Sequence, residues 1–254
     1  MSPIAIFLIA LASVFGSALL GMILRAYLPE HHLTADSRDV MKMGTGMIAT
    51  MAALVLGLLI SSAKGTFDTM NNGLRQTASK VILLDRTMAR YGPEARESRA
   101  VLRRTVTNAI KRIWPEEKNE IAFEKAGHVE GDVESLDDKL RQLSPRNDDQ
   151  RRLLAQALQI SGDIQEGRWL LIAQAGQSSI PMPFLVLLIC WLTIIFFNFG
   201  LFTSRNTSVI IVLFVCAVSA ASSLFLILEL DQPYAGLIKI SSAPLLNALA
   251  LLGQ

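Results

Sequence analysis

Long apolar runs and one charged region divide this chain of 254 residues. Four runs contain no Asp, Glu, Lys or Arg, and they cover residues 3–24, 43–63, 169–204 and 206–228. A helix rises about 1.5 Å per residue, so about 20 apolar residues cross the hydrocarbon core of a bilayer. None of the runs alternates between apolar and polar residues as a barrel strand does. The pattern therefore predicts four spanning helices, near residues 3–24, 43–63, 183–202 and 207–228.

The charged residues are concentrated between the second and third of these spans. Residues 64–180 hold 19 of the 24 Lys and Arg residues and 17 of the 22 Asp and Glu residues. This near balance is typical of a solvated globular domain and argues against a nucleic-acid-binding surface. The predicted fold class is all-α: a four-span transmembrane helical protein with a helical cytoplasmic domain inserted between spans 2 and 3. The expected divisions are a transmembrane hairpin (1–63), a soluble helical domain (64–180), a second hairpin (181–229) and an apolar interfacial tail (230–254).

A seam of apolar residues continues from the second span into the charged region. The residues recur at alternating steps of three and four, which is the spacing of a helix with one apolar stripe. Its members are Phe67, Met70, Leu74, Val81, Leu84 and Met88. The Gly92-Pro93 pair is expected to end this helix. We interpret the seam as a surface through which copies of the chain associate.

Three further helices are predicted in the charged region, at about residues 94–114, around 136–143, and from about 147 onward. In the tail, Ser242 is expected to cap a helix that begins at Pro244. The leucines of this short helix would form one apolar face, which belongs either at the membrane interface or against neighbouring helices.

Small residues recur every fourth position in the second span. They are Ala49, Ala53, Gly57, Ser61 and Gly65. A stripe of small side chains lets another helix approach closely, which is its commonest use in a membrane. Thr50, Gly57 and Ser61 also offer weakly polar groups of the kind that line a pore. Helix packing and pore lining both remain open, and an oligomer can combine them.

Ionisable residues stand directly at the ends of two spans. Glu229 follows the fourth span and Lys64 follows the second. Such groups mark an ion path or form a structural ion pair at the membrane surface, and both interpretations remain open. Inside the third span, Asn198 is expected to hydrogen-bond a neighbouring helix. Arg205 is expected to reach the interface.

Signatures of enzymes and metal sites are missing from the sequence. There is no Gly-rich phosphate loop, no HExxH and no CxxC. The turn between the first two spans contains Glu30, His31, His32, Asp36 and Asp39, but their spacing matches no zinc pattern. We therefore expect no enzymatic activity, no cofactor and no metal.

Five stretches resemble the bestrophin-like family of bacterial membrane proteins. They are LLDRTMARYGPEARESRAVLRR (83–104), IWPE (113–116), RWLL (168–171), FLVLLICWLTIIFFNFGLFTSRN (184–206) and LILELDQPYAGLIKISSAPL (226–245). The resemblance implies a four-span helical membrane protein. By analogy with the bestrophin channels, it also implies a ring of subunits with a cytosolic helical domain.

The leading functional interpretation is a homo-oligomeric ion channel or pore. Its expected partners are the lipid bilayer, further copies of the chain and small ions. The candidate path residues are Thr50, Gly57, Ser61, Lys64 and Glu229. The alternative is a non-conducting membrane scaffold or regulator whose helical domain binds a partner protein. Lys and Arg near the span ends do not decide the orientation. The charged domain contains no cysteine, and on this ground together with the family resemblance we expect it and both termini on the cytoplasmic side of a bacterial inner membrane.

Overall fold

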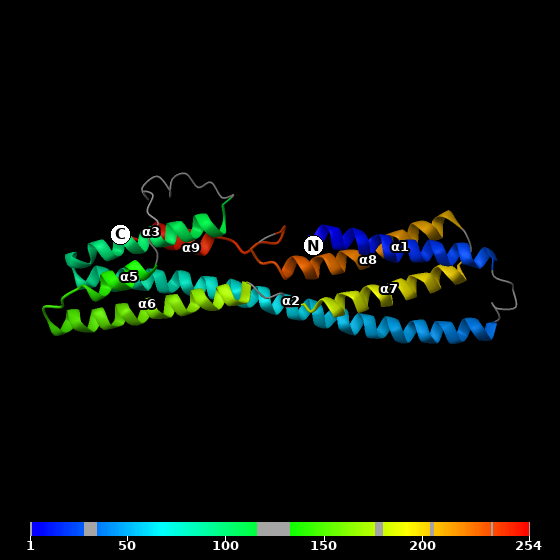
Figure 1. The fold of residues 1–254 in the computed structure, drawn as a ribbon, viewed down its shortest axis with the longest axis horizontal. Helices are drawn as coiled ribbons and strands as arrows, with labels where there is room; N and C mark the ends of the chain where they lie inside the picture. The colour runs from blue at the N-terminus through cyan, green and yellow to red at the C-terminus, as the bar shows by residue number, and fades with distance from the viewer. Residues whose placement is uncertain are drawn as a thin grey trace. The chain divides into compact units, whose positions relative to one another are not determined.

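The computed structural model describes residues 2–27, 35–115, 133–175, 180–203, 206–234 and 236–253. Every regular element in these ranges is a helix, as the apolar periodicities predict (Figure 1). The elements are α1 (Pro3–Tyr27), α2 (Ala35–Tyr91), the 3-10 turn η2 (Pro93–Ala95), α3 (Arg96–Ile113), α5 (Val133–Arg141), α6 (Asp148–Ala175), α7 (Met182–Phe202), α8 (Thr207–Leu230) and α9 (Ala243–Leu251). The all-α prediction is confirmed.

Four of these helices are long and apolar enough to cross a membrane. They are α1, α7, α8 and the part of α2 from Asp39 to Tyr91. The uncharged runs 3–24 and 43–63 lie within α1 and α2, α7 lies within the run 169–204, and α8 covers the run 206–228 except for its first residue. A helix is the element that satisfies every backbone group within a single span. The chain is therefore a multi-pass membrane protein.

The helices form two compact units, and the first unit comprises Met1–Phe67 and Ser178–Ile238. In it, α1 packs against α7 and α8. Small and medium side chains of α1, such as Ala10, Val14 and Ala18, are fully buried. Phe7 meets Phe225 edge to face, with the ring centroids 6.0 Å apart. Small residues allow close helix approach, and the phenyl rings fill the remaining space.

The second unit comprises Asp68–Gln177 and Lys239–Gln254. It contains residues 68–91 of α2 together with α3, α5, α6 and α9. Its core includes Leu84, Ile110, Leu140 and Leu249, each no more than 2% exposed. The tail helix α9 packs against α3, so of the two sites expected for it, the structure shows the one against neighbouring helices.

Of the helix-ending and helix-capping residues predicted from the sequence, Gly92-Pro93 acts as expected and Ser242 does not. Gly92 has φ +127° and is followed by Pro93, and together they end α2 as predicted. Ser242 occupies the N-cap position of α9, but its side chain makes no capping hydrogen bond. Ser242 has helical backbone angles, and a capping side chain normally requires extended ones. The Ser241 hydroxyl instead accepts a bond from the Ala243 amide at 3.2 Å.

Candidate functional site

The spanning part of α2 buries one narrow side against its own chain. Thr45, Ala52, Leu59 and Ala63 are the buried residues of this segment, each 8% exposed or less. They are separated by seven, seven and four residues, so they share one side of the helix. Beside them, Ile48, Val55, Leu56 and Ile60 are partly buried against the same core. The rest of the segment's surface faces away from the unit.

The candidate path residues of α2 lie together on this outward surface. Thr50, Gly57, Ser61 and Lys64 are all exposed. Each helical residue turns by about 100°, so the four fall within an arc of about 60°. We call them the polar edge. The Thr50 hydroxyl donates to the Gly46 carbonyl of its own helix at 2.9 Å, which leaves its oxygen able to accept.

Large apolar side chains occupy the neighbouring arc of the same surface. Met47, Met51, Leu54 and Leu58 are 50–70% exposed, and we call them the apolar edge. They too fall within an arc of about 60°. Between Gly46 and Lys64 the outward surface of α2 is therefore divided lengthwise, whereas Met43, 74% exposed, lies in line with the polar edge nearer the start of the helix. One side is suited to lipid, and the other carries small and polar groups.

The four-residue stripe makes no close intramolecular helix contact at its centre. Ala53, Gly57, Ser61 and Gly65 are exposed, whereas Ala49 is half-buried. A step of four residues turns the helix by about 400°, so the stripe drifts around the axis by about 40° per step. A Cβ atom placed at Gly57 would meet nothing within 4 Å.

Close helix approach within the chain occurs instead between α1 and α7. A Cβ atom at Gly21 would overlap the Phe197 carbonyl, and one at Gly200 would overlap the Ala18 carbonyl. The two backbones therefore touch at positions where only glycine fits. Glycines inside the first and third apolar runs were the available sequence signal for this contact.

The apolar seam of α2 is filled within one chain. Met70, Leu74, Val81, Leu84 and Met88 are at most 3% exposed in the second unit. Phe67 is partly buried against the core of the first unit. The periodicity thus identified the buried side of a helix, but the covering residues belong to the same chain. In this structure the seam offers no open surface to a second copy.

The two charged candidates have different surroundings. The Glu229 side chain is 3% exposed, and its Oε2 accepts a hydrogen bond from the Leu237 amide at 2.7 Å. Gly236 has φ +91°, and a Cβ there would collide with this carboxylate. Lys64 is exposed, with its Nζ 5.6 Å from the centroid of the Phe67 ring. Of the two, only Lys64 belongs to the outward surface of α2.

A polar contact inside the first unit was predicted from the sequence. Asn198 Nδ2 on α7 donates to Thr45 Oγ1 on α2 at 3.0 Å. This confirms the expectation that Asn198 bonds a neighbouring helix. A second such contact joins Ser17 Oγ on α1 to the Thr193 carbonyl on α7 at 3.0 Å, and sequence reasoning missed it.

A largely buried ion pair joins α2 and α3 in the second unit. Arg99 Nε and Nη2 donate to the two oxygens of Asp85 at 2.7 and 2.8 Å. The Asp85 side chain is 4% exposed and that of Arg99 is 21% exposed. Hydrogen bonding to Asp85 raises the pKa of Arg99, so the guanidinium stays charged.

The same region of the second unit holds the C-terminal segment. Gly253 N donates to Asp85 Oδ2 at 3.3 Å, and Arg103 Nη1 donates to the Leu252 carbonyl at 3.3 Å. Further along, Trp114 Nε1 donates to the Ile240 carbonyl at 2.8 Å. These partners are more than 120 residues apart in sequence, so no local pattern indicates them.

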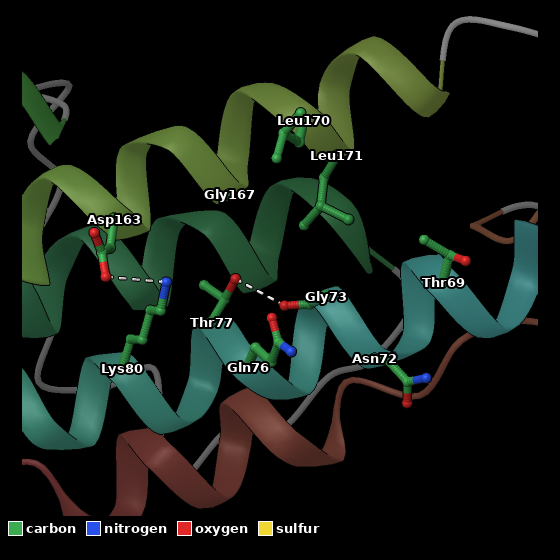
Figure 2. A pocket seen from close by; sticks show the side chains of 10 residues that line it. All are labelled: Thr69, Asn72, Gly73, Gln76, Thr77, Lys80, Asp163, Gly167, Leu170 and Leu171. Carbon is green, nitrogen blue, oxygen red and sulfur yellow. Dashed lines mark hydrogen bonds and ion pairs between the residues drawn. The ribbon is translucent and has the colours of Figure 1, made fainter.

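A pocket of about 350 Å³ lies between α2 and α6 in the second unit. Figure 2 shows Lys80 from α2 and Asp163 from α6 joined at one end, with Leu171 of α6 directed toward Gly73 of α2. The Lys80–Asp163 distance is 3.2 Å. No sequence pattern predicts this pocket, because its lining comes from two helix segments about 90 residues apart.

The histidine-containing turn lies largely outside the residues that the structure describes. Glu30, His31 and His32 lie outside the described residues, and so does Arg205. Asp39 forms an ion pair with Lys42 at 3.4 Å. Among residues that the structure describes, no three His, Cys, Asp or Glu side chains are grouped closely enough to hold a metal ion.

Comparison with protein families supports the resemblance found in the sequence. The family model described as "Bestrophin-like domain" matches residues 11–245, which include all four apolar helices except the start of α1. Neither the comparison with curated proteins nor the comparison with solved structures found a match. The family match covers most of both units, and so the chain belongs to the bestrophin-like family.

Proposed function

We propose that this protein is a homo-oligomeric ion channel in which the polar edge of α2 faces a shared path. The observation that carries the proposal is the lengthwise division of the outward surface of α2. Small and polar groups are poor partners for acyl chains, whereas a neighbouring helix or a hydrated path accepts them. The apolar edge, with Leu54 70% and Leu58 68% exposed, is suited to lipid.

The charge at the end of the polar edge gives the path a preferred ion. Several copies of Lys64 around an axis form a positive ring, which raises the local concentration of anions. Glu229 would favour cations, but its carboxylate is buried and bonded to the backbone of residue 237. The proposed channel therefore selects anions through Lys64.

Conduction is tested with purified protein in planar bilayers under a salt gradient. Wild type should give a reversal potential whose sign indicates anion selectivity. Lys64→Gln should move this potential toward zero. Glu229→Gln is the matched comparison, and it should leave the reversal potential unchanged while lowering the yield of folded protein. Reproducible silence from well-folded oligomers would falsify the channel and favour the scaffold alternative.

We further propose that the second unit and both termini lie in the cytoplasm of a bacterial cell. Four spans keep them on one side, and the charged region contains no cysteine. An impermeant maleimide applied to intact cells should label a cysteine placed at Asp39 but not one placed at Gln142. The reverse labelling pattern contradicts this orientation.

A further inference from the structure

The α2–α6 pocket offers an accessible pair of opposite charges. Lys80 and Asp163 form its end, and their side chains are 39% and 44% exposed. A half-exposed pair of this kind contributes little to stability, since water competes for both groups. Both charges can therefore exchange their mutual contact for contact with a ligand.

Neutral polar groups continue the lining beside this pair. Gln76 and Asn72 contribute amides from α2, and both side chains are exposed. Thr77 donates its hydroxyl proton to the Gly73 carbonyl at 2.9 Å, so its oxygen remains an acceptor. A ligand with several donors and acceptors would find partners along this wall.

The facing wall is apolar and kept open by glycine. Leu170 and Leu171 supply it from α6, and Leu170 is 55% exposed. A Cβ atom at Gly73 would stand 3.3 Å from Leu171 Cδ2, and one at Gly167 would stand 3.6 Å from Thr77 Oγ1. Larger residues at these two positions would fill the space between the helices.

The charge balance of the lining excludes several ligand classes. Asp163 is the only carboxylate among the lining residues, whereas a hard divalent cation needs several oxygen ligands. A phosphate group would meet one lysine beside a carboxylate, which repels it. A ligand that carries one positive and one negative group matches both charges without leaving either unpaired.

We propose that this pocket binds a small zwitterion of amino-acid size with an aliphatic side chain. Its ammonium group contacts Asp163, its carboxylate contacts Lys80, and its side chain lies against Leu170 and Leu171. A pocket of about 350 Å³ lies at the small end of the range for ligand sites and suits such a molecule. The site is independent of the proposed ion path, so it stands whether or not the protein conducts.

Isothermal titration calorimetry of the full chain in detergent tests this site with three probes: L-leucine, isovalerate and isopentylamine. Leucine should bind with a Kd of about 1 mM or lower. Isovalerate lacks the ammonium group and isopentylamine lacks the carboxylate, so each loses one charge-assisted hydrogen bond. Each should bind at least about tenfold more weakly than leucine.

Variants assign the binding to the pocket. Lys80→Gln and Asp163→Asn should each weaken leucine binding at least about tenfold. The control is Lys139→Gln, which breaks the 2.8 Å ion pair with Glu97 elsewhere in the second unit and should leave the Kd unchanged. Absence of leucine binding at about 20 mM, well above the expected Kd, overturns the proposal. Equal affinity for leucine and isovalerate, or wild-type affinity in Lys80→Gln, overturns it as well.

Discussion

The two segments of α2 use the same helical periodicity in different ways. In residues 68–91 the seam from Met70 to Met88 is buried inside the second unit of one chain. In residues 39–67 only a narrow side is buried, and residues such as Leu58 and Gly57 stay exposed. The first pattern is typical of a completed core, whereas the second leaves a surface for lipid or for another copy.

Because of this difference, the surface available for self-association is the exposed membrane segment of α2 and not the apolar seam. A heptad-like spacing shows that one side of a helix is covered, but it does not show which chain supplies the cover. The seam, with Leu84 fully buried, is covered by its own chain. The polar edge, centred on Gly57, has no such cover, and so it is the better candidate for contact between subunits.

The largest expected effect separates glycines that touch a backbone from glycines that do not. Gly200→Leu should prevent folding of the first unit, because its side chain would have to occupy the position of the Ala18 carbonyl. Gly57→Leu should leave the monomer folded and change only the oligomeric state. Fluorescence-detected size exclusion measures the amount of folded protein and the oligomeric state of both variants. Equal loss of folded protein in the two variants would contradict the prediction that, of these two glycines, only Gly200 touches a backbone.

Leu74→Asp tests whether the seam is internal to one chain. Leu74 is 3% exposed, so a buried, unpaired carboxylate there should destabilise the second unit by about 4 kcal/mol or more. Leu83→Asp is the control, since Leu83 is 48% exposed on the same helix and should change stability by less than about 1 kcal/mol. Denaturant unfolding measures both. If Leu74→Asp gives a folded, stable monomer, the seam is covered by a second subunit and not by its own chain.

Two ion pairs of the second unit differ in burial and should differ in energy. Asp85→Asn leaves Arg99 without its charged partner and should cost about 3 kcal/mol. Asp137→Asn breaks the pair with Arg141, whose side chain is 68% exposed, and should lower stability far less, because water screens this pair. Thermal unfolding compares the two variants. Similar midpoints would show that burial of Asp85 does not strengthen its contribution.

The sequence predicted the fold well where local physics decides it. Four predicted spans of bilayer length, one in each uncharged run, correspond to four apolar helices, and Gly92-Pro93 ends α2. The interhelical bond of Asn198 was also predictable, because an amide inside an apolar span needs a partner.

The parts that escaped prediction depend on residues far apart in the chain. The contact between Asp85 and Gly253 joins positions separated by 168 residues. Burial of Glu229 depends on a turn at Gly236, and the glycine itself was the sequence signal for this turn. Hydropathy likewise indicates that the outward surface of α2 exists, but only the structure divides it into a polar and an apolar edge.

Accessibility of cysteines along α2 to a charged thiol reagent tests the ion path most directly. The native Cys190 and Cys216 are both exposed and are first replaced by serine. Single cysteines are then placed on the polar edge, at Gly57 and Ser61, and on the apolar edge, at Leu54 and Leu58. In reconstituted vesicles, a hydrated path along α2 predicts rapid modification at Gly57 and Ser61 and none at Leu54 and Leu58. Equal rates on both edges, or no modification at either, would contradict the path.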